Sequence, residues 1–444
     1  MHAQHLEEKR TAVRWKILLL ISAVSFVSYV LRTNLSIAGE AMIGDLGLTK
    51  IQLGMILSAF AWGYALFQFP GGVVGDMLGS RRSVAGIAVL WAALTFLTGV
   101  VPGASALNPV WILTTLIVLR FLVGVSQAPI FPIIGGAIAT WFPLPDRALP
   151  NGLTSTALTL GGAATAPLLV WLMEIQGWRQ SFLITAPLGL IAAAAWWWYV
   201  RDDPAQHPGV GKRELDLIQT NRGFWTLDPA LEKQGWKQTL RNRNVLLLTA
   251  SYFCTNYVFY LFFNWFFFYL IDVRAVGKQQ AANFTAAQWI LGAVGATLGG
   301  FLCDHLVKRY GLRWGYRLVP IPSMILAALS LFLGSTANHA YLAVALLSFS
   351  FACTQLTEGS YWSAIASVAG RHAASAGGVM NTGGNAVGGI GALLVPLTAE
   401  MFGWTAAMVT GSAFAIAAAA LWLFIRADVP MGLINHKDHG DHKA

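Results

Sequence analysis

The chain has 444 residues, of which 56% are hydrophobic and 11% are charged. Soluble proteins carry roughly 25% charged residues, so this composition excludes a soluble globular domain. Apolar stretches of about 20 residues or more recur along the whole chain, which is typical of membrane-spanning helices and too long for barrel strands. The net charge of +9 does not indicate nucleic-acid binding, because the lysines and arginines gather on one side of the apolar stretches, as in cytoplasmic loops.

Twelve apolar stretches are predicted to cross the membrane as helices, so the expected fold is all-α and integral to the membrane. In chain order they lie at residues 15–38, 52–77, 83–101, 109–138, 150–173, 181–200, 244–270, 283–303, 315–335, 340–369, 375–398 and 404–426. The charged start, MHAQHLEEKR, leads into a full-length first span, so we expect no cleaved signal peptide. With an even number of spans, both termini are expected in the cytoplasm of a multi-pass protein of the inner (cytoplasmic) cell membrane.

One long polar segment interrupts the apolar pattern after the sixth span. It divides the chain into an N-terminal six-helix bundle, a cytoplasmic linker, a C-terminal six-helix bundle and a cytoplasmic tail, at residues 1–200, 201–243, 244–426 and 427–444. The two bundles repeat each other at an offset of about 228 residues, as parallel repeats in transporters do. The matching pairs include Tyr29 with Tyr257, Gly72 with Gly300, and Asp76 with Asp304.

The loop after the second span, GGVVGDMLGSRR at residues 71–82, resembles the signature loop of the major facilitator superfamily. The matching positions are Gly72, Asp76, Gly79, Arg81 and Arg82, and the equivalent loop of the second bundle carries Asp304 and Arg309. Small residues allow two helices to approach closely, and acids and arginines at a cytoplasmic helix end can pair across the bundles and separate when the bundles rock. We therefore expect these residues to take part in conformational gating.

Three charged residues lie well inside the predicted spans, namely Arg32, Arg120 and Glu358. Inserting a charged side chain at the bilayer centre costs at least about 2.5 kcal/mol, so each of these residues is expected to have a structural or functional role. The first bundle has two arginines and no acid at this depth, which favours an anion. Arg32 is the candidate clamp for a substrate carboxylate, and the alternative is snorkelling towards the outer interface. Arg120 is either a gating residue or a structural arginine bonded to backbone carbonyls or to a neighbouring helix.

Further stretches resemble the anion:cation symporter family, which includes bacterial sugar-acid and hexuronate transporters and vesicular organic-anion carriers. They are YVLRTNLSIA, SAFAWGYALFQFPGG, RFLVGVSQAPIFP, RDDPAQHPGV followed by EL, and GGVMNTGGNAVGG. The resemblance implies the major facilitator fold and a small organic anion as substrate. It also implies a substrate site that includes Tyr29, Arg32, Tyr64, Trp362 and Asn381.

Spacing and repeat symmetry extend this candidate substrate site. The added residues are Gln68, one turn after Tyr64; Gln127, nearly on the helix face of Arg120; Tyr257, the repeat partner of Tyr29; and Asn385, one turn after Asn381. The two asparagines can present amides to hydroxyl groups of a ligand, and the alternative is hydrogen bonding between helices.

The chain departs from proton-coupled members of this family at two positions. Where those members typically carry acids, this sequence has Leu31 and Gln127, neither of which can take up a proton. Glu358 is then the remaining deep carboxylate, and an acid in apolar surroundings can exchange a proton during a transport cycle. We predict Glu358 as the coupling acid. Three alternatives stay open: it pairs with an arginine, it binds a cationic part of the substrate, or transport is uncoupled.

The expected function is secondary active transport of a small organic anion, a sugar acid or another hydroxy-carboxylate, with protons as a possible co-substrate. The alternatives are an uncoupled facilitator and a membrane nutrient sensor of the same fold. The sequence has no phosphate-binding loop, HExxH pair or GxSxG elbow, so we expect neither an enzyme nor a cofactor. The three cysteines lack metal-ligand spacing, so no metal is expected either. The expected partners of this monomer are the substrate, protons and the lipid bilayer.

Overall fold

A computed structural model describes residues 11–103, 108–220 and 235–431, and the regular elements among them are all helices. The first half comprises α1 (Val13–Leu46), α2 (Lys50–Leu78), α3 (Ser80–Gly99), α4 (Pro109–Gln127), α5 (Ile130–Trp141) and α6 (Ala148–Tyr199). The linker contains α7 (Lys212–Thr220) and α9 (Gly235–Thr239). The second half comprises α10 (Arg243–Asp272), α11 (Lys278–Gly315), α12 (Pro320–Thr336), α13 (Ala340–Gln355), α14 (Glu358–Ala369) and α15 (Ala373–Trp422). Most of the predicted tail and the middle of the linker lie outside the described residues.

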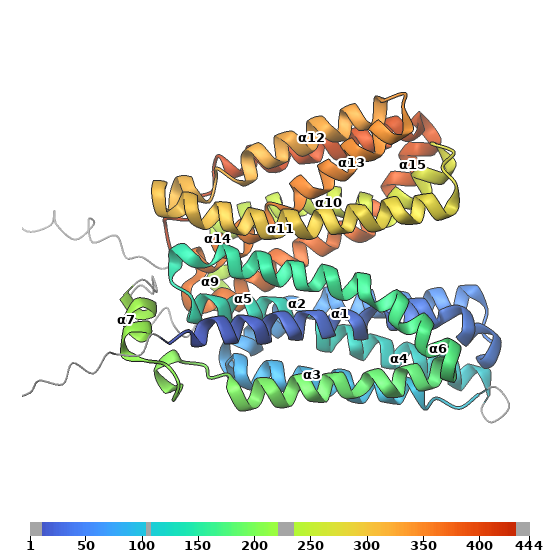
Figure 1. Cartoon of the computed structure of the whole chain (residues 1–444), viewed down its shortest axis with the longest axis horizontal. Helices are drawn as coiled ribbons and strands as arrows, with labels where there is room; N and C mark the ends of the chain where they lie inside the picture. The colour runs from blue at the N-terminus through green and yellow to red at the C-terminus, as the bar shows by residue number, and fades with distance from the viewer. Residues whose placement is uncertain (1–10, 104–107, 221–234, 432–444) are drawn as a thin grey trace, which may run out of the picture.

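Two long elements, α6 and α15, each consist of two apolar helical arms joined at a glycine. Gly177 in α6 and Gly403 in α15 have φ angles of 80° and 84°, in the left-handed region that favours glycine. Figure 1 shows that α6 reverses its direction. Without the break α6 would span roughly 78 Å, more than twice the bilayer core of about 30 Å. The glycine therefore allows both arms to fit within one membrane thickness.

The described residues contain nine helical stretches that are long and apolar enough to cross a membrane, and a shorter apolar helix covers Pro320–Thr336. The predicted all-helical, multi-pass membrane architecture is therefore confirmed. The number of twelve spans stays a prediction. The two predicted spans at 150–173 and 181–200 correspond to the two arms of α6, and those at 375–398 and 404–426 to the arms of α15.

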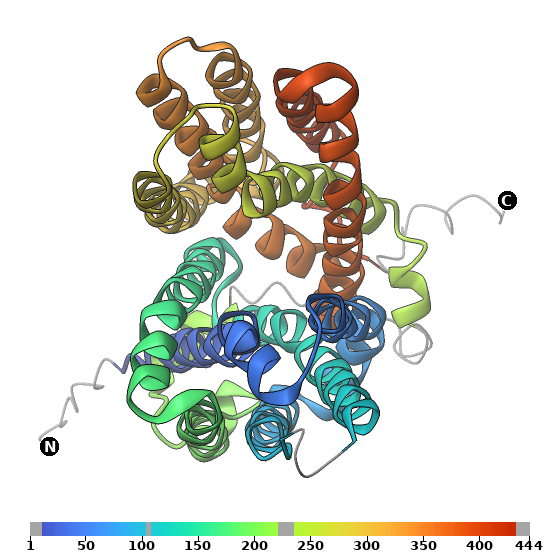
Figure 2. The ribbon, with the colours of Figure 1, turned by 90° about the vertical axis from the view of Figure 1, so that its right-hand side faces the viewer.

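The helices form two bundles. Figures 1 and 2 show α1 to α6 in one bundle and α10 to α15 in the other. The linker helix α7 lies beside the end at which α1 begins, which we call the linker end; the opposite end is the far end. The bundles lie close together at the linker end and diverge towards the far end (Figure 1).

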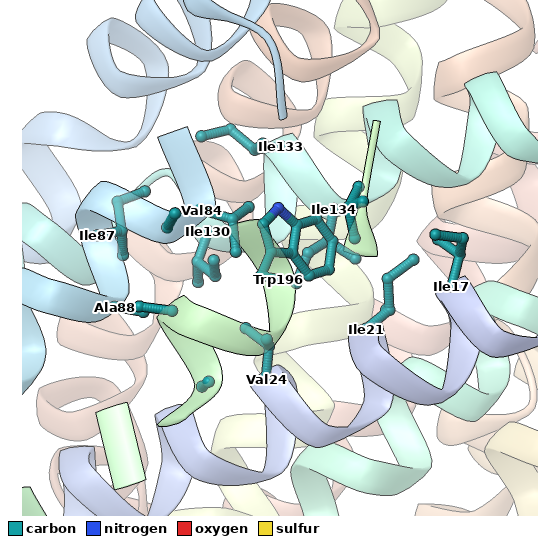
Figure 3. Close-up of a cluster of buried hydrophobic side chains, with 14 of the residues drawn as sticks. Ile17, Ile21, Val24, Val84, Ile87, Ala88, Ile130, Ile133, Ile134 and Trp196 are labelled. Atoms are coloured by element: carbon teal, nitrogen blue, oxygen red, sulfur yellow. The ribbon is translucent and has the colours of Figure 1, made fainter. Parts of the chain in front are cut away.

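Apolar side chains fill the interior of each bundle and also cover its outside. Figure 3 shows one core, in which Trp196 of α6 is surrounded by aliphatic side chains from α1, α3 and α5, labelled Ile17, Ile21, Val24, Val84, Ile87, Ala88, Ile130, Ile133 and Ile134. On the outside, Leu19 and Phe402 are each 70% exposed. Helices that are apolar on all sides are expected where the outer face meets lipid. Hydrophobic periodicity therefore does not identify the inward face of these helices.

The start of the linker caps two helices of the first half. Asp202 accepts a hydrogen bond from the backbone N–H of Arg81, in the first turn of α3, at 2.8 Å. The buried carboxylate of Glu214, in α7, accepts the backbone N–H groups of Val13 and Arg14 at the start of α1, both at 3.1 Å. These N–H groups lack partners within their own helix, and a carboxylate there also complements the helix dipole. The linker thus holds the linker ends of α1 and α3 in place.

We expect Glu214→Ala to lower the unfolding temperature of the purified protein by about 1–2 °C, because loss of a helix cap costs about 1–2 kcal/mol. Differential scanning fluorimetry in detergent measures this shift. Asp216→Ala is the matched control, because Asp216 is exposed on the same helix. Equal unfolding temperatures for Glu214→Ala and wild type would contradict the capping role.

Candidate functional site

A cavity of about 100 Å³ lies between the two halves, near the middle of α1. Its first-half wall comes from α1, α2, α5 and α6, and its second-half wall from α10, α13, α14 and α15. Seven residues of the sequence-predicted site line it: Tyr29, Arg32, Tyr64, Glu358, Trp362, Asn381 and Asn385. This volume has room for several waters or a compact ligand.

Arg32 presents its guanidinium to this cavity without a carboxylate partner. Among the described residues, no acid oxygen lies within 4.0 Å of it. Its guanidinium carbon lies 5.2, 4.8 and 4.6 Å from the ring centroids of Tyr29, Phe60 and Tyr64. Aromatic faces stabilise a cation without neutralising it. Arg32 is therefore held by rings inside the cavity and stays available to an anion, which disfavours the snorkelling alternative.

Arg120 lies behind Arg32 and is 4% exposed. Its Nη2 donates to the backbone carbonyl of Arg32 at 2.9 Å, and its guanidinium carbon lies 5.4 Å from the ring centroid of Phe60. This is the arrangement of the structural alternative, an arginine bonded to a backbone carbonyl. Both contacts lie within the first half, so they give no support to a gating role across the halves. The charge of Arg120 nevertheless adds to the positive potential of this wall.

Glu358 faces the cavity from the second half, at the start of α14. The hydroxyl of Tyr252 donates to its Oε2 at 3.2 Å. No arginine, lysine or histidine nitrogen of the described residues lies within 4.0 Å of this carboxylate, so the alternative of an ion pair with an arginine is wrong for this conformation. The cavity therefore carries a cation on its first-half wall and an acid on its second-half wall, with no ion pair between them.

Sequence reasoning missed several polar residues of the cavity wall, among them Tyr252, Asn256, Tyr260 and Gln355. The first three follow one another at four-residue intervals along α10, which places them on one helix face. This polar spacing within an apolar helix is a signal that the sequence contains. Amide and hydroxyl groups of this kind can bind the hydroxyls of a sugar acid.

Three predicted substrate residues are not part of the cavity wall. Gln68 is fully buried on α2, where its backbone carbonyl faces Gly378 of α15. Gln127 is also buried, and its Nε2 donates to a backbone carbonyl of α1 at 3.2 Å. Tyr257 lies in the second-half core, stacked on Phe414 with the ring centroids 4.0 Å apart. In this conformation none of the three is placed to contact a ligand in the cavity.

Between the cavity and the linker end, a carboxylate of the first half caps a helix of the second. Asp76, near the end of α2, accepts the backbone N–H groups of Ala374 and Ser375 at 3.2 and 2.9 Å. It also accepts the hydroxyl of Ser375. These groups belong to the first turn of α15, so the carboxylate satisfies free N–H groups and complements the helix dipole.

A carboxylate of the second half caps a helix of the first half in the same way. Asp304, in α11, accepts the backbone N–H groups of Ala148 and Leu149, in the first turn of α6, at 2.7 and 2.9 Å. Each signature-loop acid therefore caps a helix of the opposite half. The repeat symmetry seen in the sequence is thus also a symmetry of the contacts between the halves.

The signature-loop arginines do not bond these acids in the part of the chain that the structure describes. Arg81 donates to a backbone carbonyl of its own half at 2.9 Å, and Arg82 and Arg309 are exposed. The expected pairing of the two acids with arginines is therefore wrong: their partners are backbone N–H groups. An ion pair between Lys308 and Asp146 does join the two halves.

The two signature-loop glycines of the first half have distinct structural roles. A Cβ on Gly72 would lie 2.5 Å from the backbone oxygen of Ala374, so only glycine permits this approach of α2 to α15. Gly79 has a φ of 80° and forms the turn between α2 and α3. Gly72 thus allows the contact that brings Asp76 to its partners.

The contacts between the halves close the linker end. At the depth of the cavity, Thr156 bonds Thr297 at 2.8 Å. Closer to the linker end follow the bond from Asn151 to Ser363 at 3.1 Å and the two helix caps. Towards the far end the bundles diverge, as Figure 1 shows.

Known proteins are similar in sequence to most of this chain. The family model of the Major Facilitator Superfamily matches residues 21–392. The probable sulfoacetate transporter of Cupriavidus necator is 32% identical over 85% of each chain. The probable galactarate/D-glucarate transporter of Bacillus subtilis is 31% identical over 85% of this chain and 84% of its own. The hexuronate transporter of the same species is 29% identical over 92% of this chain and 94% of its own.

Solved structures share the fold at low sequence identity. The proton:xylose symporter matches with a TM-score of 0.71 and 14% identity, covering 94% of this chain and 98% of its own. The fucose:proton symporter of E. coli matches with a TM-score of 0.69 and 13% identity, covering 93% and 99%. From its sequence, its relatives and its fold, the chain belongs to the major facilitator superfamily.

Proposed function

We propose that this protein is a secondary active transporter of a small organic anion, a sugar acid or another hydroxy-carboxylate, and that it works by alternating access. The observation that carries the proposal is Arg32, a cation in the cavity between the halves without an acid partner among the described residues. A guanidinium binds a carboxylate through two parallel hydrogen bonds. The relatives are named as transporters of sulfoacetate, galactarate or D-glucarate, and hexuronate, all of which are organic acids.

In the proposed topology the chain crosses the inner membrane twelve times, with the arms of α6 and of α15 as separate spans. The linker end faces the cytoplasm together with both termini, because most lysines and arginines lie in its loops. A structure closed at the linker end is then the outward-facing state. The caps made by Asp76 and Asp304 hold this state together and must separate before substrate reaches the cytoplasm.

Uptake into proteoliposomes tests the proposed function. The panel contains radiolabelled hexonates, hexuronates, sulfoacetate and simple monocarboxylates, each with and without an inward proton gradient. Saturable uptake of an acid supports the transporter, and stimulation by the gradient distinguishes a symporter from an uncoupled facilitator. Binding of an acid without uptake would identify a nutrient sensor instead. Neither binding nor uptake of any acid would overturn the proposal.

Glu358 is the proposed coupling acid of a proton symporter. Its carboxylate lines the cavity, has a tyrosine hydroxyl as its hydrogen-bond partner and has no cationic partner among the described residues. A carboxylate in this position can take up a proton while the cavity faces one side and release it on the other. Because Leu31 and Gln127 cannot do so, the first half offers no substitute at those positions.

We expect Glu358→Gln to abolish accumulation driven by a proton gradient and to leave counterflow exchange of substrate intact. The glutamine keeps the size and hydrogen-bonding capacity of the side chain and cannot carry a proton. Uptake under an imposed gradient and counterflow at equal pH are measured in the same proteoliposomes. Glu174→Gln is the matched control, because Glu174 is exposed near the end of the first arm of α6. Gradient-driven accumulation by Glu358→Gln at the wild-type level would refute the coupling role.

A further inference from the structure

Three polar side chains form a continuous hydrogen-bonded chain on the second-half wall of the cavity. The Tyr260 hydroxyl donates to Oδ1 of Asn385 at 2.7 Å. Nδ2 of Asn385 donates to both the backbone oxygen and Oδ1 of Asn381, at 2.8 and 3.0 Å. Nδ2 of Asn381 then lies 3.5 Å from the Tyr64 hydroxyl on the opposite wall. All four residues line the cavity.

The backbone carbonyl of Asn381 determines the donor and the acceptor of every hydrogen bond in this series. The backbone carbonyl of Asn381 can only accept, so the group of Asn385 that faces it must be the amide nitrogen. The Asn385 oxygen therefore faces Tyr260, whose hydroxyl must donate its single proton there. The same nitrogen of Asn385 also bonds the side-chain oxygen of Asn381, which leaves the Asn381 amide nitrogen directed at the opposite wall.

Because the directions of these hydrogen bonds are fixed, Tyr260 and Asn381 each present either a donor or an acceptor to the cavity, and not both. The Tyr260 hydroxyl donates its single proton to Asn385, and its oxygen makes no other hydrogen bond within the described residues. It therefore offers only lone pairs to a ligand. Asn381 offers N–H groups beside Tyr64, whose ring centroid lies 4.6 Å from the Arg32 guanidinium. The donors of this wall are thus near the arginine, and Tyr260 is an acceptor.

Building on the proposed function, we propose that Tyr260 determines specificity by accepting a hydrogen bond from a hydroxyl group of the bound acid. Asn381 supplements Arg32 as a donor to the ligand's anionic end. An acid without a hydroxyl leaves the Tyr260 oxygen without a hydrogen-bond partner on the ligand, which weakens binding. The site is therefore built for a hydroxy-carboxylate, and a plain carboxylate or an unhydroxylated sulfonate is a poorer ligand.

Calorimetric binding to the purified wild type and to Tyr260→Phe tests this inference. The ligands are D-galactonate, D-gluconate and D-glucuronate, followed by the monodeoxy analogues of whichever binds tightest. We expect one analogue to bind the wild type about tenfold more weakly than its parent, the usual effect of losing one hydrogen bond. Tyr260→Phe should bind the parent acid more weakly than the wild type does, by a similar factor. It should bind that analogue with the same affinity as the wild type does. Tyr269→Phe is the control, because Tyr269 is a buried, hydrogen-bonded phenol in α10 outside the cavity wall.

Two results would overturn the role of Tyr260. The first is that the ratio of the affinity for the parent acid to the affinity for each deoxy analogue is the same in the wild type and in Tyr260→Phe. The second is binding of sulfoacetate or a simple monocarboxylate in preference to every hydroxy acid, which would leave the transporter proposal standing and remove the acceptor role. Failure of the wild type to bind or take up any acid would overturn both proposals together. Retained folding of Tyr260→Phe is checked by its unfolding temperature against that of Tyr269→Phe.

Discussion

We expect Arg32→Ala to abolish saturable uptake of the transported acid, and Arg32→Lys to retain no more than about a hundredth of wild-type uptake efficiency. Removing one partner of a buried charge pair costs about 2–5 kcal/mol, because the ligand's carboxylate then enters the cavity without compensation. Lysine restores the charge and loses the planar fork that bonds both carboxylate oxygens. It also loses the guanidinium stacking between Tyr29, Phe60 and Tyr64.

The measurement is the concentration dependence of uptake into proteoliposomes with matched amounts of folded protein. Arg213→Ala serves as the control, because Arg213 is exposed on α7 and does not line the cavity. Size-exclusion profiles separate loss of binding from loss of folding. Uptake by Arg32→Ala with the wild-type apparent affinity would show that the anion binds elsewhere.

The second large effect is expected at the paired helix caps. Asp76→Ala and Asp304→Ala should each shift the protein towards the state that is open at the linker end, because each removes the partner of two N–H groups in the opposite half. A charged cap at a helix N-terminus contributes about 0.5–2 kcal/mol, so each substitution changes the ratio of the two states by roughly 2- to 30-fold. The two sites lie in separate contacts, so the effects of the double variant should add in free energy.

Cysteine accessibility measures this shift. Ser363 is fully buried and bonded to Asn151 across the halves, so Ser363→Cys in a background without the native cysteines reports opening of the linker end. We expect a membrane-impermeant maleimide, added from the linker side, to label it faster in the capping variants than in the wild type. Asp216→Ala is the control, as an exposed acid of the linker. Unchanged labelling in the double variant would rule out the caps as determinants of the conformational equilibrium.

Much of the fold and part of the site follow from the sequence alone. The low charge content and the recurring apolar stretches determined a helical membrane protein, because lipid leaves every backbone polar group to be satisfied within its own helix. The repeated glycine and acid pattern identified the two halves and the superfamily. Arg32 and Glu358 stood out because a charge in an apolar span needs a reason, and both line the cavity.

The tertiary structure alone decided which helix faces meet the cavity. These helices are apolar on every side, so spacing shows which residues share a face and not where that face points. Gln127 and Tyr257, chosen by spacing and repeat symmetry, therefore turned out to face other helices, whereas Tyr260 faces the cavity. The partners of Asp76 and Asp304 also could not be predicted, because they are backbone N–H groups, which every sequence has and only the packing of two helix ends exposes. The sequence thus determined the membrane fold and the charges that need a partner, and the packing of the halves decided which partners they have.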